Sequence, residues 1–344
     1  MSLMAKLKKN SKIKLTAQMD KSEFFQEQEV VPTDVPMMNV ALTGSLDGGI
    51  TAGLTVLAGP SKHFKTSFAL KMAAAYLNAK PDAVMLFYDS EFGSPQSYFD
   101  NFGIDTSRVL HVPIMDVEEL KFDLIAQLED MDKEDDVIIV IDSIGNLASK
   151  KELEDAKNEK SVADMSRAKA LKGLFRMTTP YLAMKNIPLL AINHTYKEIG
   201  LYPKDIVGGG TGIYYSANNI WIIGRRQNKT GTEVMGYDFV IKVEKSRFVK
   251  EQSKIPITVS WEGGIDEMSG LLDVAMASGH VIKPSNGWYQ KVNEEKKYRL
   301  ADLDKTFWTP ILELPDFQEF VKKAFSVGSA VVDLNIELEG EFNG

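Results

Sequence analysis

The amino-acid sequence predicts an α/β fold, with a mainly parallel sheet that carries helices on both faces. Short, continuous apolar runs rich in Val, Ile and Leu recur along the chain, as expected for strands buried on both faces. Longer segments with helical periodicity lie between them, and this alternation is typical of a parallel sheet. The predicted strands are residues 54–59, 83–89, 137–142, 187–193 and 219–224, and the clearest predicted helices are residues 66–79 and 165–177.

The pattern changes after residue 219, where apolar and polar residues alternate around a glycine-containing turn. The segments YDFVIKVEK (237–245) and KIPITVSW (254–261) then follow. We expect these segments to form antiparallel strands added to the edge of the sheet.

Three regions are predicted. Residues 1–36 form a basic, helical N-terminal arm, residues 37–267 the main α/β domain, and residues 268–344 a small α+β domain with a turn at 284–289 and an acidic end. The apolar residues of the arm have no obvious partner within it, so the arm either docks on another protomer or packs on its own domain. These residues are Ile13, Leu15, Ala17, Phe24 and Phe25.

Composition excludes several classes of protein. The 344 residues contain no cysteine, which rules out disulfides and thiolate metal sites and suits a reducing compartment. Apolar runs fall short of the roughly 18 residues of a membrane span, so we expect a cytoplasmic protein with no membrane partner. The net charge of −8 argues against a wholly basic surface, although local basic elements can still attract phosphates.

The segment GPSKHFKT (59–66) differs from the phosphate-loop pattern G-x-x-x-x-G-K-[ST] only in having Phe64 at the second glycine. A buried strand precedes it and a helix follows, which is the context that a phosphate loop requires. Lys65 is predicted to contact the β/γ phosphates of ATP, and Thr66 to contact Mg²⁺. The alternative is an ordinary strand–turn–helix corner. Phe64 is compatible with a phosphate loop if its φ is negative and its ring points away from the phosphates. The predicted ATP-binding residues here are Gly59, Pro60, Ser61, Lys62, His63, Phe64, Lys65, Thr66 and Ser67.

Two acids complete this prediction. Asp142 ends the apolar strand VIIVID, as in the Walker B arrangement, and is predicted to hold Mg²⁺ together with Thr66. A turn or helix cap is the alternative role. Glu91 ends an earlier strand, where a carboxylate can polarise the attacking water in phosphoryl transfer. A solvated loop acid is the alternative.

The order of GPSKHFKT, FYDSE, VIIVIDS, LLAINH, GGGTG and VEKSR over residues 40 to 290 resembles the RecA-family ATPase core. The details look closest to the UvsX recombinases of T-even-type phages, whose phosphate loop also lacks the second glycine. This resemblance implies an ATP-dependent DNA strand-exchange recombinase, with ATP and Mg²⁺ as cofactors, that forms helical filaments. The implied partners are single-stranded DNA, homologous duplex DNA, a single-strand DNA-binding protein and a recombination mediator, in a host's cytoplasm if the chain is phage-encoded.

The resemblance also implies roles for individual residues of the nucleotide site. Glu91 becomes the general base, Tyr98 stacks on adenine, and His194 senses the γ-phosphate. Lys245 and Arg247 in VEKSR reach across to a neighbour's ATP, although exposed charges at a strand end are the alternative. Pro95 replaces an acid that bacterial RecA uses near the adenine.

Two segments match the family's DNA-binding loops. The first covers about 150–163 and leads into a helix whose basic residues share a face, with a solvated charged face as the alternative. Met165, Ala168, Leu171 and Phe175 are expected to face the core from the same helix. The second, residues 195–212, is a connection long enough to be either functional or disordered. The predicted DNA-binding residues are Arg167, Lys169, Lys172, Arg176, Lys197, Lys204, Gly208, Gly209, Gly210 and Thr211.

Two other functions remain open at this point. One is a hexameric RecA-fold helicase, which ring-shaped particles and duplex unwinding would favour. The other is a P-loop kinase or signalling ATPase that ignores DNA.

Overall fold

A nine-stranded sheet forms the centre of the computed structural model, which describes residues 2–22, 29–158, 166–198, 200, 203–230, 233–261 and 264–329. Its strands run in the order β11-β10-β9-β8-β1-β5-β4-β2-β3. The strands are β1 (Gly53–Ala58), β2 (Val84–Asp89), β3 (Val109–Pro113), β4 (Val137–Asp142), β5 (Pro188–Asn193), β8 (Asn219–Thr230), β9 (Glu233–Ser246), β10 (Lys254–Ser260) and β11 (Gly264–Ile265).

The predicted fold class is confirmed. Strands β1, β2, β3, β4, β5 and β8 pair in parallel, whereas β9, β10 and β11 continue the sheet in antiparallel pairs. All five strands predicted from apolar runs are present. The sequence prediction omitted β3, because this edge strand is only five residues long and half exposed, and its apolar pattern is weak.

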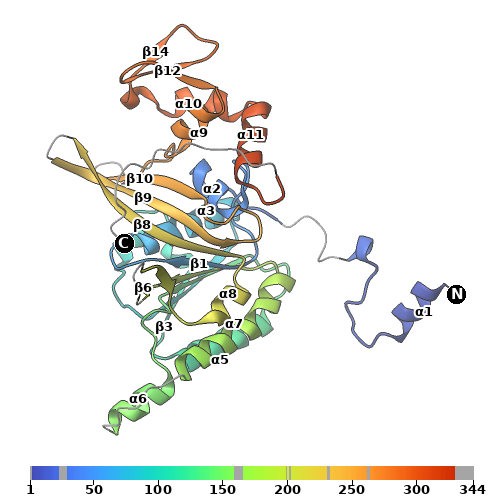
Figure 1. The fold of residues 1–344 in the computed structure, drawn as a ribbon. Coiled ribbons are helices and arrows are strands. Elements are labelled where there is room, and N and C mark those ends of the chain that lie inside the picture. Colours follow the sequence, from blue (N-terminus) through green and yellow to red (C-terminus); the bar gives the residue numbers. More distant parts are fainter. Residues whose placement is uncertain are drawn as a thin grey trace.

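Helices cover both faces of the sheet (Figure 1). On one face, α2 (Pro36–Thr43) and α3 (Lys65–Ala79) pack with Trp221, Phe239 and Ile241. On the other face, α5 (Val117–Asp130) and α7 (Ser166–Met184) share a core with Ile220 and Ile222, joined by the short α8 (Thr211–Ser216). This arrangement leaves the carboxyl ends of the parallel strands free at one edge, which is where open α/β sheets bind ligands.

The β8–β9 hairpin contains a β-bulge near its base. Ile220 pairs with Lys245 and the next residue, Trp221, pairs with Val243, so Glu244 is an extra residue in β9. A bulge of this kind changes the direction in which the following side chains point.

The C-terminal region contains helices and a small sheet, as predicted. It comprises α9 (Leu271–Ala277), β12 (Val281–Ser285), β13 (Trp288–Lys291), β14 (Lys297–Tyr298), α10 (Lys305–Leu312) and α11 (Pro315–Phe325). The predicted turn at 284–289 joins β12 to β13. Leu271 and Phe317 belong to the same buried cluster as α2 and α3, so this region continues the main core, and the boundary at residue 267 stays a prediction. The acidic end lies outside the described residues.

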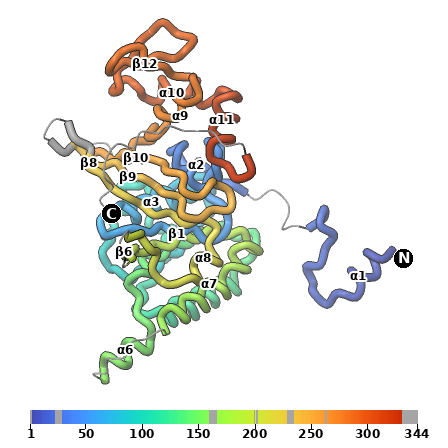
Figure 2. The backbone as a smooth tube through the Cα atoms, in the orientation of Figure 1, coloured from blue at the N-terminus to red at the C-terminus, as the bar shows by residue number. Residues whose placement is uncertain are grey.

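Residues 2–22 of the N-terminal arm extend away from the rest of the chain (Figure 2). They contain the helix α1 (Leu3–Asn10) and a short 3-10 helix at Met19–Lys21, and none of these residues is buried, whereas Val31, Thr33 and Val35 near the end of the predicted arm are buried. Phe24 and Phe25 of the predicted arm lie outside the described residues. The arm therefore does not pack on its own domain through residues 2–22. In the described chain, we find no helix with the length and apolar character needed to cross a membrane.

Candidate nucleotide site

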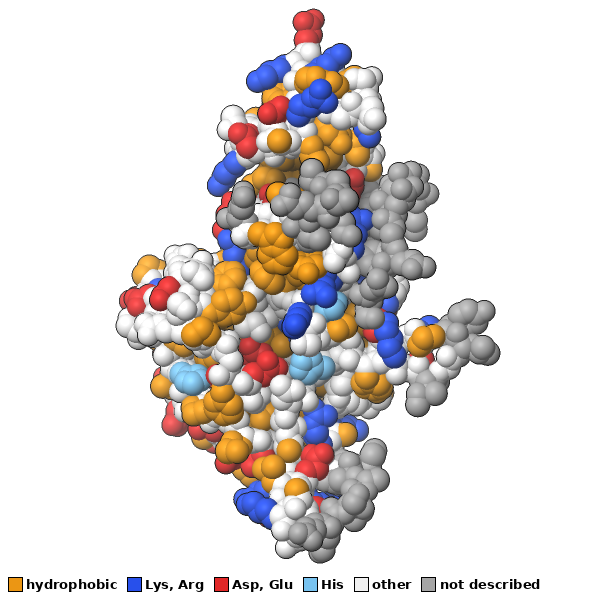
Figure 3. Space-filling model, turned by 90° about the vertical axis from the view of Figure 1, so that its left-hand side faces the viewer, with side chains coloured by type: hydrophobic (Ala, Val, Ile, Leu, Met, Phe, Trp, Pro, Cys, Tyr) orange, Lys and Arg blue, Asp and Glu red, His pale blue; other side chains and the backbone are white. Residues whose placement is uncertain are grey.

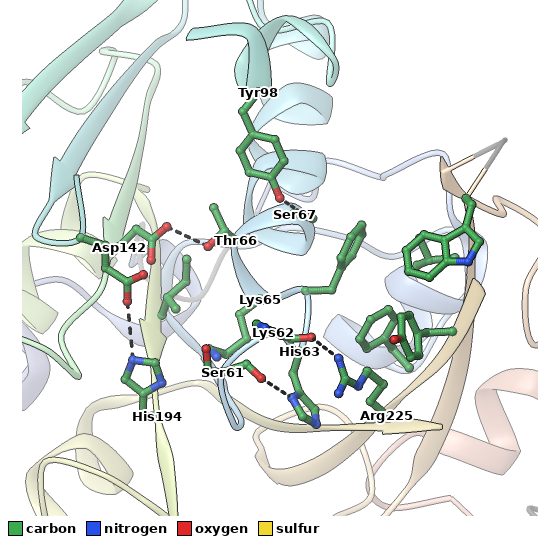
Figure 4. A pocket seen from close by; sticks show the side chains of 17 residues that line it. Ser61, Lys62, His63, Lys65, Thr66, Ser67, Tyr98, Asp142, His194 and Arg225 are labelled. Atoms are coloured by element: carbon green, nitrogen blue, oxygen red, sulfur yellow. Dashed lines mark hydrogen bonds and ion pairs between the residues drawn. The ribbon is translucent and has the colours of Figure 1, made fainter. Parts of the chain in front are cut away.

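The segment predicted to be a phosphate loop joins β1 to α3 and borders a cavity of about 430 Å³ (Figure 4). Lys65 begins α3, and its Nζ donates a hydrogen bond to the Pro60 carbonyl oxygen at 2.7 Å. Burial lowers the pKa of Lys65, while Glu91 and Asp142 oppose the shift. The N-terminus of α3 also carries backbone N–H groups without helical partners, which favour a bound anion.

Thr66 and Asp142 come together at the edge of the sheet, 76 residues apart in sequence. The Thr66 hydroxyl donates to Asp142 Oδ2 at 2.8 Å. The other carboxylate oxygen, Oδ1, is buried and has no hydrogen-bond partner among the residues that the structure describes. A hydroxyl and a carboxylate with a free oxygen are suitable Mg²⁺ ligands, so these two residues fit the metal that was predicted here.

Burial raises the pKa of Asp142 to about 6, against the opposing effect of the Thr66 hydrogen bond. Since the pKa is higher in the folded chain than in the unfolded chain, folding favours the protonated acid. The cost to stability appears as the pH rises from about 4 to 6 and is complete above that range.

We therefore expect Asp142→Asn to stabilise the metal-free chain at pH 8 by up to about 3 kcal/mol, with the gain vanishing below about pH 4. Urea unfolding with a chelator at several pH values would measure this. Asp135→Asn, which changes an exposed acid, is the control. A gain at pH 8 that persists unchanged at pH 4 would contradict the assignment.

Glu91 lies on the same edge and is held by several side chains. Its Oε1 accepts hydrogen bonds from the Ser143 hydroxyl at 2.9 Å and from Asn146 Nδ2 at 3.0 Å. His194 Nε2 lies 3.5 Å from the same oxygen. The structure thus brings together Asp142, which ends β4, His194, which directly follows β5, and Glu91, which lies two residues after β2.

Asp89 supports the turn that carries Glu91, and the sequence analysis did not identify it. Its Oδ1 accepts the backbone N–H groups of Glu91 and Phe92 at 2.9 and 2.8 Å. His111 Nε2 lies 3.1 Å from its other oxygen. The sequence did contain a sign of this role, because aspartate side chains often accept hydrogen bonds from the backbone two residues further on.

Phe64 has a positive φ of 60°, so the condition of a negative φ that the sequence analysis set for this residue is not met and was too strict. It stands at the N-cap of α3 in the left-handed conformation that the usual glycine adopts. Its ring packs against Phe68 of α3 and Phe239 of β9.

Tyr98 reaches the same cavity from α4 (Gln96–Asp100), and its hydroxyl pairs with that of Ser67. Arg225, Tyr237 and Trp261 also line the cavity, from β8 and β9 and from the residue after β10. Sequence reasoning missed these three. Their contribution depends on the long β8–β9 hairpin, whose pairing no local motif reveals. Figure 3 shows histidine, acidic and basic side chains close together in the middle of the face on which this edge opens.

The helix predicted to contact DNA is α7. Lys169, Lys172 and Arg176 are exposed on it, as expected, while Leu171 and Phe175 are buried. Arg167 differs, because its guanidinium donates to the carbonyl oxygens of residues 144, 145 and 147 at 2.6 to 2.9 Å. It therefore holds the loop after β4. Met165 and residues 159–163 lie outside the described residues, and residues 150–157 form a helix, α6 (Lys150–Lys157), where a loop was predicted.

The segment 195–212, predicted to be either functional or disordered, contains regular structure in its described residues. Strands β6 (Thr195–Lys197) and β7 (Asp205–Val207) form a hairpin, with an ion pair between Lys197 and Asp205 at 3.0 Å. Lys204 is exposed just before β7, and Thr211 begins α8.

The predicted glycines connect this hairpin to the nucleotide edge. The N–H of Gly208 donates to the His194 carbonyl oxygen at 3.0 Å. Gly209 and Gly210 have φ of 90° and 76°, and a Cβ at Gly209 would lie 2.8 Å from the Ile213 side chain. These glycines permit a tight turn into α8 directly beside His194.

Lys245 and Arg247 do not line the cavity of their own chain. Lys245 Nζ donates to the carbonyl oxygens of Tyr214 and Ala217 at the end of α8, the second at 2.9 Å. Burial lowers the pKa of Lys245, and so does the neighbouring Arg247, which is exposed. Neither cation therefore borders the candidate nucleotide cavity of its own chain.

Comparison with known proteins agrees with this geometry. The family model of the RecA N-terminal domain matches residues 3–266, and the model of the C-terminal domain of the bacteriophage T4 recombination and repair protein matches residues 268–321. The Recombination and repair protein of Enterobacteria phage T4 is 49% identical over 98% of this chain and 89% of its own. Protein RecA of Thermus aquaticus is 27% identical over 91% of this chain and 89% of its own. The chain therefore belongs to the RecA family.

Proposed function

We propose that this RecA-family protein is an ATP-dependent recombinase that assembles as a helical filament on single-stranded DNA and exchanges strands with homologous duplex DNA. The observation that carries the proposal is the pairing of Thr66 with Asp142, beside Lys65 and Glu91, at the end of a phosphate loop. The similarity to the T4 recombination and repair protein supports DNA recombination and repair as its process. A single-strand DNA-binding protein and a recombination mediator are the further partners that we propose.

Each residue of the site would have a separate role in ATP hydrolysis. Lys65 and the N-terminus of α3 would bind the phosphates, and Tyr98 would pack on the adenine. Glu91, fixed by Ser143 and Asn146, would orient the attacking water. Mg²⁺, held by Thr66 and Asp142, would offset the charge of the phosphates when bound.

His194 connects the proposed hydrolysis site to the hairpin that we propose to bind DNA. It lies 3.5 Å from Glu91, and its carbonyl oxygen accepts the N–H of Gly208 at the base of the β6–β7 hairpin. A change at the γ-phosphate position would therefore reach the hairpin through one residue. We propose that this hairpin and the basic face of α7 hold the DNA backbone.

The exposed arm is the element that we propose for self-association. Leu3, Ile13 and Met19 are more than half exposed on it, and its charged residues up to Lys14 are all basic. The edge strand β3, the segment after it and α5 of the main domain also expose apolar side chains, at Leu110, Met115 and Phe122 in turn, and α5 carries five acids. Charge and apolar surface thus match between the arm of one copy and this edge of the next.

ATP turnover measured with and without single-stranded DNA tests the proposal, together with strand exchange and electron microscopy of the assemblies. We expect hydrolysis to rise with DNA, and filaments to form. Rings that unwind duplexes would favour a helicase, and turnover that ignores DNA would favour a kinase or signalling ATPase.

DNA binding is expected to be electrostatic, with affinity falling as salt rises. Each phosphate contact on single-stranded DNA contributes about 0.7 to the slope of log affinity against log salt. Lys172→Ala and Arg176→Ala should each make this slope shallower by about that amount. Lys322→Ala, an exposed change on α11, is the control. Unchanged slopes in both test variants would leave this face of α7 as an ordinary solvated surface.

A further inference from the structure

Phe64 occupies a backbone conformation that ordinarily requires glycine. Its φ and ψ of 60° and 18° lie in the left-handed region, which is unfavourable for any residue with a Cβ atom. This turn sets the direction in which Lys65 and Thr66 enter α3. Some other interaction must therefore hold Phe64 in place.

The ring of Phe64 supplies that interaction. It stacks on Phe239 with the centroids 5.2 Å apart and the planes at 22°, and meets the edge of Phe68 at 5.7 Å. Phe68 and Phe239 in turn meet edge to face at 5.8 Å, so the three rings form a closed triangle. Such pairs contribute more than the area they bury.

The partners of Phe64 are themselves firmly placed. Phe68 and Phe239 are almost completely buried. Phe239 lies in the middle of β9, paired with Arg225 on β8 and with Ile257 on β10. The triangle therefore fixes the phosphate loop to the antiparallel half of the sheet.

A second contact from the same hairpin holds the other left-handed residue of the loop. Lys62 has a φ of 63°, and its carbonyl oxygen accepts a hydrogen bond from Arg225 Nη1 at 3.1 Å. The Arg225 guanidinium lies over the ring of Tyr237, 4.6 Å from its centroid. Both left-handed residues of the loop are thus held by β8 and β9.

We propose that Phe64 is a positioning residue that keeps the phosphate loop preorganised for ATP, with its ring packed on Phe239 and Phe68 in place of the backbone freedom of glycine. This inference rests on the proposed ATP site. It predicts a ranking of variants that neither a tolerated substitution nor a simple packing role would produce.

Phe64→Ala keeps a Cβ atom, for which the left-handed conformation is unfavourable, and removes the ring that holds the residue there, so the loop should relax to another conformation. ATP binding would then have to restore the left-handed conformation, and its free-energy cost should weaken the affinity for ATP by about 5- to 30-fold. Phe64→Gly should bind ATP with an affinity between those of the parent and Phe64→Ala, because glycine permits the turn but does not fix it. The KM for ATP should rise in the same order, with kcat changed less than about twofold, since saturating ATP restores the loop.

The test is equilibrium binding of ATP with Mg²⁺, with Lys65→Ala as the baseline for a disabled loop. Phe239→Leu should weaken binding in the parent but have little further effect on Phe64→Gly, because the ring that it supports is already gone. This second variant keeps the test decisive if Phe64→Ala does not fold. Phe307→Leu, which removes one ring of the Tyr298–Phe307 pair in the C-terminal region, is the matched control and should leave ATP affinity unchanged.

Tighter binding by Phe64→Gly than by the parent would overturn the inference, since Phe64 would then be only a tolerated departure from glycine. Equal affinities in all three proteins, with lower melting temperatures in the two variants, would reduce Phe64 to a packing residue and also overturn it. A parent chain that binds ATP no better than Lys65→Ala would instead refute the ATP site itself, and the inference with it.

Discussion

Glu91→Gln is expected to hydrolyse ATP about 10²–10⁴-fold more slowly than the parent, with ATP binding preserved. The amide keeps the size of the side chain and can still meet Ser143 and Asn146, which contact the carboxylate at 2.9 and 3.0 Å. It cannot accept a proton or attract the positive end of a water dipole as a carboxylate does. The loss should therefore fall on kcat, while the affinity for ATP stays close to that of the parent.

Single-turnover hydrolysis on saturating single-stranded DNA, together with equilibrium binding of ATP, separates these two effects. Glu119→Gln serves as the control, because this acid lies in the first turn of α5 and does not line the cavity. Normal turnover by Glu91→Gln would show that another group orients the water, and Asp89 would be the next residue to test.

The second large effect is expected at Arg247. Since Arg247 is exposed and absent from the lining of its own cavity, Arg247→Ala should bind ATP normally through an intact loop. If the cation acts on a neighbour's phosphates, hydrolysis should fall about 10³-fold or more, as for other arginines supplied in trans. Arginine suits this role because its planar guanidinium can contact two phosphate oxygens at once.

Mixing two variant proteins tests whether Arg247 acts on the ATP of a neighbouring protomer. Arg247→Ala and Lys65→Ala proteins are each expected to be inactive alone and to regain part of the activity in mixed filaments, because some interfaces combine an intact loop with an intact Arg247. A chain that carries both changes is the control, since mixing it with either single variant creates no complete interface. Full activity of Arg247→Ala alone, or no recovery in filaments shown to be mixed, would reject a role in trans.

The part of the site on the parallel strands could be predicted from the sequence. Continuous apolar runs identify buried strands, and residues at their carboxyl ends must meet at one edge. This is why Lys65, Glu91, Asp142 and His194 come together, although Thr66 and Asp142 are 76 residues apart.

The part on the antiparallel strands could not be predicted in this way. Arg225, Tyr237 and Trp261 line the cavity only because β8, β9 and β10 pair in one particular register, which short motifs do not reveal. The positive φ of Phe64 is a related case. A favourable contact with Phe239, 175 residues away, outweighs the local backbone preference, whereas sequence reasoning that considered the loop alone allowed Phe64 there only with a negative φ.

Arg167 illustrates a different limit. Periodicity placed it among the basic residues of one helix, but periodicity does not show that three carbonyl groups lie within its reach. The long connection at 195–212 was likewise judged by its length, whereas its hairpin depends on pairing between three-residue strands that are too short to recognise.

The bulge at Glu244 decides which face of the sheet receives the cation at residue 245. Along β9, Phe239, Ile241 and Val243 all point to the side of α2 and α3, and strict alternation would send Lys245 the same way. The extra residue shifts this alternation by one position. Lys245 therefore points to the opposite face, together with Ile220, and contacts the end of α8. The direction of the Lys245 side chain therefore depends on this one extra residue. A single insertion or deletion next to Glu244 would turn it into the apolar core.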